Sequence, residues 1–317
     1  MFEVNWVDFG LRVEYMMKKQ TKTATKTKKT VPRLRKSAHR FPVLEDADAA
    51  DRFQHAILHW DGLARKRIEN GNTIGILGEK SMHSILKAFV TTDDDSYEIP
   101  IRSIKDEASD RKFVADILEN GHIYEIQTGG FYPLIPKLRY YLEHTVYDVT
   151  VIHPLPGIRY KVWIDPESGE VVERKKSTTK GRAEDALKEL FWIREFLSSP
   201  RLHVKLLILE EEEYRYLDGW SKDKKRGSNR CERVPVALLG EAALDSPSDY
   251  LEFLMPELPT EFTASEFGAL FGFRGKTVYS ALKVFLSLGI FREIGKRGRS
   301  ILYCRADFSA LTEDADD

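Results

Sequence analysis

The chain lacks several features that mark common classes of protein. Only 2 of its 317 residues are cysteines, Cys231 and Cys304, and they lie far apart, so the sequence predicts neither a disulfide framework nor a zinc site. No apolar run approaches the length of a membrane-spanning helix. Neither a Walker loop nor a dinucleotide fingerprint is present, so no nucleotide cofactor is implied. These absences predict a cytoplasmic protein without a membrane partner.

Charge is distributed unevenly along the chain. The formal net charge is -1, and a hydrophobic content of 42% is enough for two domains with their own cores. Residues 18–40, however, contain ten basic residues and no acidic one. Such a tract cannot bury a core, so residues 1–44 are predicted to be a disordered basic segment that either lies along nucleic acid or only increases solubility. No apolar core of signal-peptide length precedes the tract, which argues against a targeting peptide.

Residues 113–128 predict a hairpin that carries three polar side chains toward a shared region. An Asn-Gly dipeptide at 120–121 favours a tight turn between two short apolar strands. Because side chains alternate along a strand, Glu125 and Gln127 share one face of the second strand, and Asp116 interrupts an apolar face of the first. Carboxylates on half-buried strands are costly unless they are paired, protonated or bound to a cation. A hard divalent cation such as Mg²⁺ is the natural partner, since it prefers oxygen ligands.

Residues 77–89 predict a helix with two distinct stripes. Apolar side chains recur at helical spacing and form the buried stripe: Met82, Ile85, Leu86 and Phe89. Polar side chains four residues apart form a second stripe beside it: Glu79, His83 and Lys87. The polar stripe therefore borders the core.

Together these elements resemble the PD-(D/E)XK nuclease superfamily, which has the restriction-endonuclease-like fold. In that superfamily a helix with a glutamate precedes three strands, the second with Asp and the third with Glu-x-Lys, and a helix and a further strand follow. Here residues 98–104 supply the first strand. The resemblance implies an α/β fold with a mixed sheet flanked by helices, Mg²⁺ or Mn²⁺ as cofactor, and hydrolysis of DNA phosphodiester bonds. By position, Glu79, Asp116 and Glu125 match the metal-binding acids.

Gln127 departs from the superfamily pattern because it occupies the position of the lysine. The lysine orients or activates the attacking water, whereas a neutral amide can position a water but cannot withdraw its proton. His83 or Lys87 on the facing helix is the candidate substitute. The implied catalytic set is Glu79, His83, Lys87, Asp116, Glu125 and Gln127. The alternative for Gln127 is a structural amide hydrogen-bonded to the next strand.

Residues 261–305 resemble a winged helix-turn-helix domain. Thr263 or Ser265 caps a first helix, and Gly272 marks the turn to a second amphipathic helix. Two strands around a basic hairpin follow as the wing. Eight basic and three acidic residues make this segment net +5, which suits phosphate contacts with DNA. The residues predicted to face DNA are Arg274, Lys276, Thr277, Tyr279, Ser280, Lys283, Lys296, Arg297 and Arg299.

Two further charged segments have simple explanations. The run Glu210–Glu213 is expected to be a strand that leaves the core for solvent. Residues 220–233 hold six basic residues, which either grip a DNA backbone or are only solvated.

The predicted organisation is a basic segment at residues 1–44, a nuclease-like α/β domain at 45–245, a winged-helix domain at 250–310 and an acidic tail at 311–317. The expected function is metal-dependent cleavage of duplex or branched DNA. One alternative is an inactive nuclease fold that binds DNA or regulates transcription. Another is an interaction protein in which the winged helix forms a homodimer. The longer sequence is also similar to an uncharacterised bacterial family that joins a nuclease-like domain to a C-terminal winged helix.

Overall fold

The computed structural model describes residues 47–69, 81–103, 113–165, 167–168, 170–178, 181, 183–217, 229–254 and 259–306. The predictions made for the N-terminal basic tract, Glu79, residues 218–228 and the acidic tail lie outside these ranges. The chain forms two compact units. Unit 1 comprises residues 1–94, 156–181 and 208–240, and unit 2 comprises residues 95–155, 182–207 and 241–317. The domain boundaries predicted from the sequence stay predictions.

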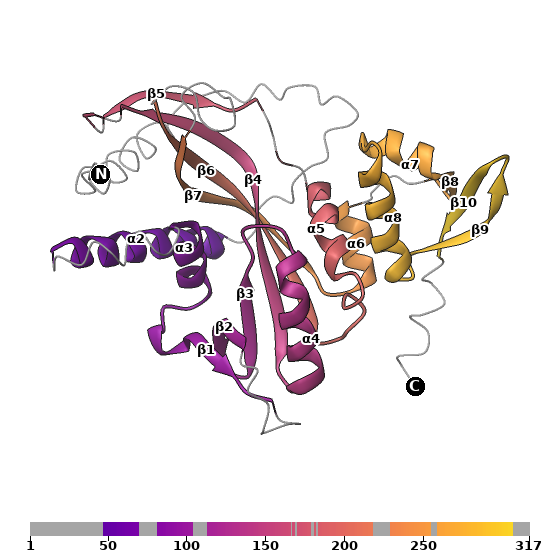
Figure 1. The fold of residues 1–317 in the computed structure, drawn as a ribbon, viewed down its shortest axis with the longest axis horizontal. Coiled ribbons are helices and arrows are strands. Elements are labelled where there is room, and N and C mark those ends of the chain that lie inside the picture. The colour runs from indigo at the N-terminus through magenta and orange to yellow at the C-terminus, as the bar shows by residue number, and fades with distance from the viewer. Residues whose placement is uncertain are drawn as a thin grey trace. The chain divides into compact units, whose positions relative to one another are not determined.

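The fold is α/β, with one mixed sheet of seven strands, as expected (Figure 1). Its order is β1-β2-β3-β4-β6-β7, and β5 pairs with β4. The strands are β1 Tyr97–Ile101, β2 Phe113–Glu119, β3 His122–Ile126, β4 Asp148–Ile164, β5 Val171–Lys176, β6 Leu202–Tyr216 and β7 Asn229–Leu244. The long strands β4, β6 and β7 contribute residues to both units.

The hairpin of β2 and β3 forms at the predicted turn in unit 2. Asn120 and Gly121 both have positive φ angles, 50° and 76°, which a tight two-residue hairpin turn requires. The chain then passes through a 3-10 turn, Tyr132–Leu134, into helix α4, Ile135–His144. That helix is the crossover to β4, which pairs with β3 in parallel, so the predicted order of three strands, helix and strand is confirmed.

Among the described residues, unit 1 contains helices α2 and α3 and the hairpin of β4 and β5. Helices α2, Ala47–Glu69, and α3, Ser81–Val90, pack through Phe53 and Phe89, whose ring centroids are 5.2 Å apart. The hairpin turns at Asp165, whose Oδ1 accepts the backbone N–H groups of Glu167 and Ser168. These two hydrogen bonds stabilise the turn between β4 and β5.

The acidic run of β6 does not leave the core for solvent, so that expectation is wrong. Glu211, Glu212 and Glu213 are only 2%, 7% and 4% exposed. Glu211 is paired with Arg159, and Arg174 Nε lies 2.6 Å from Glu212 Oε1. Buried carboxylates are tolerated when arginines neutralise them, and Arg159 and Arg174 lie 52 and 38 positions from Glu211 and Glu212. Local sequence therefore could not reveal the pairing.

We expect the substitution Arg159→Met to lower the free energy of unfolding by about 2 kcal/mol, because it leaves the buried Glu211 carboxylate without this partner. The loss should stay below that of a fully buried pair, since the Arg159 side chain is 23% exposed. Arg139→Met is the matched control, because Arg139 and Glu195 are both about half exposed. Urea denaturation of both variants measures the difference, and equal losses would contradict the prediction.

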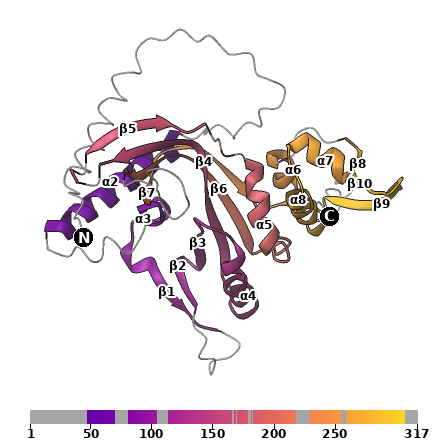
Figure 2. The ribbon, with the colours of Figure 1, turned by 45° about the horizontal axis from the view of Figure 1, so that its top comes forward.

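The C-terminal part of unit 2 is a small antiparallel sheet with helices, in the order β8-β10-β9 (Figure 2). Its elements are β8 Glu261–Thr263, α7 Ala264–Phe271, α8 Lys276–Ser287, β9 Phe291–Arg297 and β10 Ser300–Arg305. The predicted cap is confirmed, because Thr263 and Glu266 form a reciprocal capping box at the start of α7. Phe262, Phe267 and Phe285 are fully buried between these elements.

Further helical segments of unit 2 are a 3-10 turn at Ala183–Ala186, α5 Leu187–Ile193 and α6 Pro247–Leu254. Helix α5 lies beside α8. Helix α5 ends at Ile193, and the Phe196 N–H donates to the Ile193 carbonyl, which tightens the last turn. Among the helices of the described ranges, none combines the length and apolar character needed to cross a membrane.

Candidate functional site

The register of β2 and β3 places the two predicted carboxylates opposite each other. Ile117 pairs with Tyr124 and Leu118 with Ile123, so the next positions along this register are Asp116 and Glu125. Side chains at directly opposed positions of antiparallel strands point to the same face. The convergence of Asp116 and Glu125 expected from the sequence thus agrees with the geometry of the hairpin.

Glu125 is the centre of a buried polar cluster. It is 2% exposed, and Lys137 Nζ lies 3.0 Å from its Oε1 and 2.7 Å from its Oε2. The hydroxyl of Tyr141 donates a further hydrogen bond to Oε1 at 2.9 Å. Lys137 and Tyr141 lie one turn apart on α4, so a single helix face supplies both donors. The carboxylate is therefore held by a cation and a hydroxyl from one neighbouring helix.

Burial, and after it the nearby Asp116 carboxylate, raises the pKa of Glu125 to about 7. Lys137 and Tyr141 act in the opposite direction, because they stabilise the ionised form. Burial, and then the proximity of Glu125, also raises the pKa of the Tyr141 hydroxyl, which therefore stays protonated and remains a donor. The site thus stores unfavourable negative charge, which a cation would relieve.

The raised pKa predicts how stability changes with pH in the absence of divalent cations. A carboxyl whose pKa is higher in the folded state contributes stability below its unfolded value, near 4.5, and loses it as pH rises through about 7. The variant Glu125→Gln keeps the neutral shape at every pH. Between about pH 4.5 and about pH 8, the wild-type protein should lose on the order of 3 kcal/mol relative to this variant. Urea denaturation with chelator measures the difference, and parallel pH profiles would contradict it.

The Asp116 side chain on β2 is hydrogen-bonded to the backbone at the end of β3. Its Oδ2 accepts the backbone N–H of Ile126 at 2.7 Å, which fixes the carboxylate beside the end of β3. Among the described residues, no group of three or more His, Cys, Asp or Glu side chains is arranged to hold a metal ion. Mg²⁺, however, is commonly held by one or two carboxylates together with water and phosphate. Two opposed carboxylates of unit 2 fit that donor set, provided that Lys137 releases one oxygen of Glu125.

Gln127 has a structural contact in its own turn. Its Nε2 donates to the carbonyl of Gly130 at 2.6 Å, while its backbone carbonyl contacts Nδ1 of His153 at 2.6 Å. The amide side chain therefore bonds the turn after β3 and not the next strand. This arrangement does not aim the side chain at Glu125.

His83 and Lys87 lie on α3 of unit 1, whereas Asp116, Glu125 and Gln127 lie in unit 2. Lys87 is 3% exposed and His83 is half-buried. Glu79 lies outside the described residues. The three residues expected from the N-terminal helix thus remain predictions, and the cluster that the structure brings together consists of Asp116, Glu125, Lys137 and Tyr141.

Lys137 is the residue that the sequence interpretation missed. Helix α4 buries an inner face that includes Leu138 and Tyr141. Lys137 lies one turn before Tyr141 on the same helix, so it borders that inner face. One signal could have identified Lys137. It is a lysine next to the inner face of the helix that follows a strand with a buried glutamate.

The predicted DNA-facing residues form an exposed surface on the C-terminal part. Lys276, Tyr279 and Lys283 share one stripe of α8, and Tyr279 is 60% exposed. Arg274, Lys296 and Arg299 are also exposed, and Thr277 and Ser280 are half-buried. Arg297 is partly engaged, because its guanidinium lies 3.2 Å from Glu266 and 3.6 Å from Glu261.

Comparisons with known proteins give one match. Searches against curated proteins and against solved structures found no match. A family model described as "Domain of unknown function (DUF8091)" matches residues 80–245, which include both carboxylates and Lys137. Since the match covers more than half of the 317 residues, the chain belongs to the DUF8091 family.

Proposed function

We propose that this protein is a metal-dependent nuclease of the restriction-endonuclease-like type, with its site at Asp116, Glu125 and Lys137. The observation that carries the proposal is the contact of Lys137 Nζ with both oxygens of Glu125, at 3.0 and 2.7 Å. An aspartate, a glutamate and a lysine are the three groups of the Asp and Glu-x-Lys pattern. The lysine comes from α4, and Gln127 occupies its usual place on the strand.

Each side chain of this cluster has a defined task in the proposed reaction. Asp116 and Glu125 would hold Mg²⁺ or Mn²⁺, and when bound the metal supplies polarisation of the phosphate and a lower pKa for a coordinated water. Lys137 places a positive charge next to the reacting phosphate, where negative charge increases in the transition state. Tyr141 donates to Glu125 and keeps its carboxylate oriented.

The order of elements around the cluster also supports the proposal. The mixed sheet begins with the antiparallel strands β1, β2 and β3. The crossover helix α4 then leads to β4, which pairs with β3 in parallel. The C-terminal part, with α7, α8 and the hairpin β9–β10, supports a winged helix that binds duplex or branched DNA. Its exposed stripe of Lys276, Tyr279 and Lys283 would face the DNA, and Lys296 and Arg299 would contact phosphates.

The test is a cleavage assay with the full-length protein and either Mg²⁺ or Mn²⁺. Supercoiled and linear duplex DNA, a branched junction, single-stranded DNA and RNA serve as substrates. We expect cleavage of at least one DNA form, and chelator should abolish it. Absence of cleavage of every form with both metals would refute the proposal.

A second candidate is a catalytically inactive DNA-binding protein of the same fold. It is favoured by the saturation of Glu125, whose two oxygens already receive Lys137 and Tyr141. Calorimetry separates the candidates: binding of Mg²⁺ that Asp116→Asn removes, without cleavage of any substrate, would favour the inactive protein. Duplex binding that weakens when Lys276 and Lys283 are replaced by glutamine would support its DNA-binding role.

A further inference from the structure

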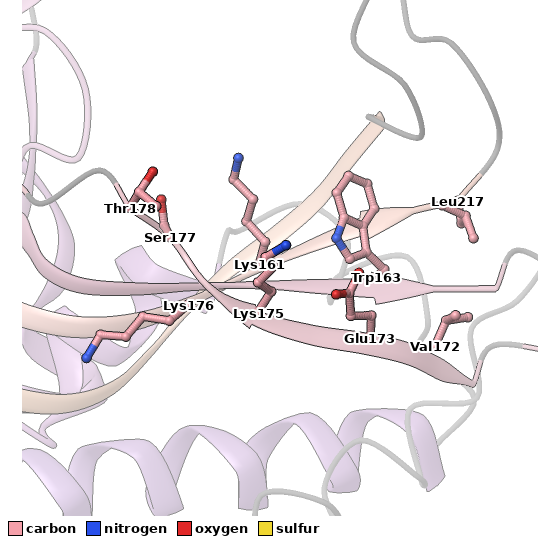
Figure 3. A pocket seen from close by; sticks show the side chains of 9 residues that line it. All are labelled: Lys161, Trp163, Val172, Glu173, Lys175, Lys176, Ser177, Thr178 and Leu217. Atoms are coloured by element: carbon pink, nitrogen blue, oxygen red, sulfur yellow. The ribbon is translucent and has the colours of Figure 1, made fainter.

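The hairpin of β4 and β5 in unit 1 presents a mixed basic and aromatic face. Lys161 lies opposite Lys175, and Trp163 lies opposite Glu173. Because side chains alternate along a strand, these four side chains share one face of the hairpin. Figure 3 shows Lys161, Lys175 and Trp163 near one another on this hairpin. We call this set the β4–β5 face.

The two lysines of the β4–β5 face form an unfavourable pair. Like charges directly opposite on antiparallel strands are destabilising, because their side chains lie close together. On the other face Arg174 is neutralised by Glu212 and stacks on Tyr160, with its guanidinium 3.5 Å from the ring centroid. Within the described part of unit 1, no such carboxylate partner is found for Lys161 or Lys175. An external anion would relieve the repulsion between these two lysines.

An apolar platform continues the face beyond the lysines. Trp163 is half-buried, while Val172 and Leu217 are 56% and 45% exposed. Together with the lysines, Ser177 and Thr178, these side chains line a partly open hollow of about 510 Å³ (Figure 3). A hollow lined by lysines and by a half-buried indole suits a ligand that has both anionic groups and flat aromatic rings.

We propose that the β4–β5 face binds single-stranded nucleic acid, with a base stacked on Trp163 and the backbone phosphates at Lys161 and Lys175. Stacking on an aromatic side chain needs an unpaired base, because the bases of a duplex are stacked on one another. Glu173 beside Trp163 disfavours a purely anionic ligand at that end of the face. This site is separate from the proposed catalytic cluster and does not depend on catalysis.

The test measures binding of fluorescein-labelled oligothymidylate to the full-length protein by anisotropy, in chelator so that no strand is cleaved. Trp163→Ala should weaken binding about tenfold. Exchange of both Lys161 and Lys175 for glutamine should weaken binding and lower the slope of log affinity against log salt by about 1.4, because two phosphate contacts are lost. Quenching of intrinsic tryptophan fluorescence by the oligonucleotide should decrease in Trp163→Phe.

Matched variants separate this site from the rest of the chain. Trp192→Ala, which removes an exposed tryptophan of unit 2, and Arg139→Gln, which removes an exposed cation, should bind oligothymidylate as the wild-type protein does. Trp163→Tyr should restore binding, since it keeps an aromatic platform. Oligouridylate in a parallel series decides whether RNA or DNA is preferred, and preferential binding of either supports the site.

Wild-type affinity in Trp163→Ala or in the double lysine variant would overturn the proposal. Equal competition by inorganic polyphosphate and by oligothymidylate would also overturn it, because charge alone would then explain binding. Strand binding is measured in chelator, so it does not require metal or cleavage. Loss of cleavage and loss of strand binding are therefore separate results, and failure of either proposal is recognisable by itself.

Discussion

Glu125→Gln and Asp116→Asn should each reduce metal-dependent DNA cleavage by at least about 100-fold. Each substitution keeps the size of the side chain but removes the negative charge that would hold the metal. Glutamine can still accept the hydrogen bond of Tyr141, and it removes the repulsion from Asp116. The loss should therefore arise from metal binding and not from unfolding.

Three measurements check this prediction. Plasmid cleavage with Mg²⁺ gives the rate, calorimetry gives the metal affinity, and thermal denaturation shows that the variants are folded. Glu143→Gln is the matched control, since Glu143 is an exposed carboxylate on α4 and should keep the wild-type rate. Wild-type cleavage by Glu125→Gln or by Asp116→Asn would remove that residue from the proposed site.

Lys137→Met should lower the rate of cleavage by about 100-fold without weakening metal binding. Methionine keeps an unbranched apolar side chain at this position of α4. It removes the ammonium group that contacts both oxygens of Glu125. Without Lys137, the oxygens of Glu125 are no longer bound by an ammonium group, so the affinity for Mg²⁺ should stay the same or increase. A simple structural ion pair would not produce this separation of rate from metal affinity.

The pKa of Glu125 supplies a second readout for the same substitution. Lys137 lowers this pKa through its charge and hydrogen bond, so its removal should shift the pH dependence of stability to higher pH. Lys137→Arg keeps a cation and should recover part of the activity. Arg139→Met on the same helix is the control for charge alone. A wild-type rate in Lys137→Met would show that the lysine only balances buried charge.

Several parts of this fold were predictable because their causes are local. The Asn120-Gly121 turn follows from the two residues that tolerate positive φ angles. The capping box of Thr263 and Glu266 is another local motif. Once the turn length and register are known, the alternation of side chains along β2 and β3 is enough to place Asp116 opposite Glu125.

Other parts were not predictable, because they depend on contacts between distant segments. The burial of Glu211 and Glu212 requires arginines from β4 and β5, which no local pattern connects to β6. Gln127 is a candidate for catalysis because it matches the lysine position of the superfamily, and this role stays a prediction. The contact of its side chain with Gly130 in the following turn follows from no sequence pattern.

The sequence by itself determined the strands, turns and caps, and which carboxylates share a face, because periodicity and turn chemistry act over a few residues. Only the tertiary structure decided which cation meets Glu125. Lys137 reaches it because α4 crosses from β3 to β4 and packs its inner face on the hairpin. The position of a lysine relative to a strand is a property of helix packing, and residue spacing does not specify it.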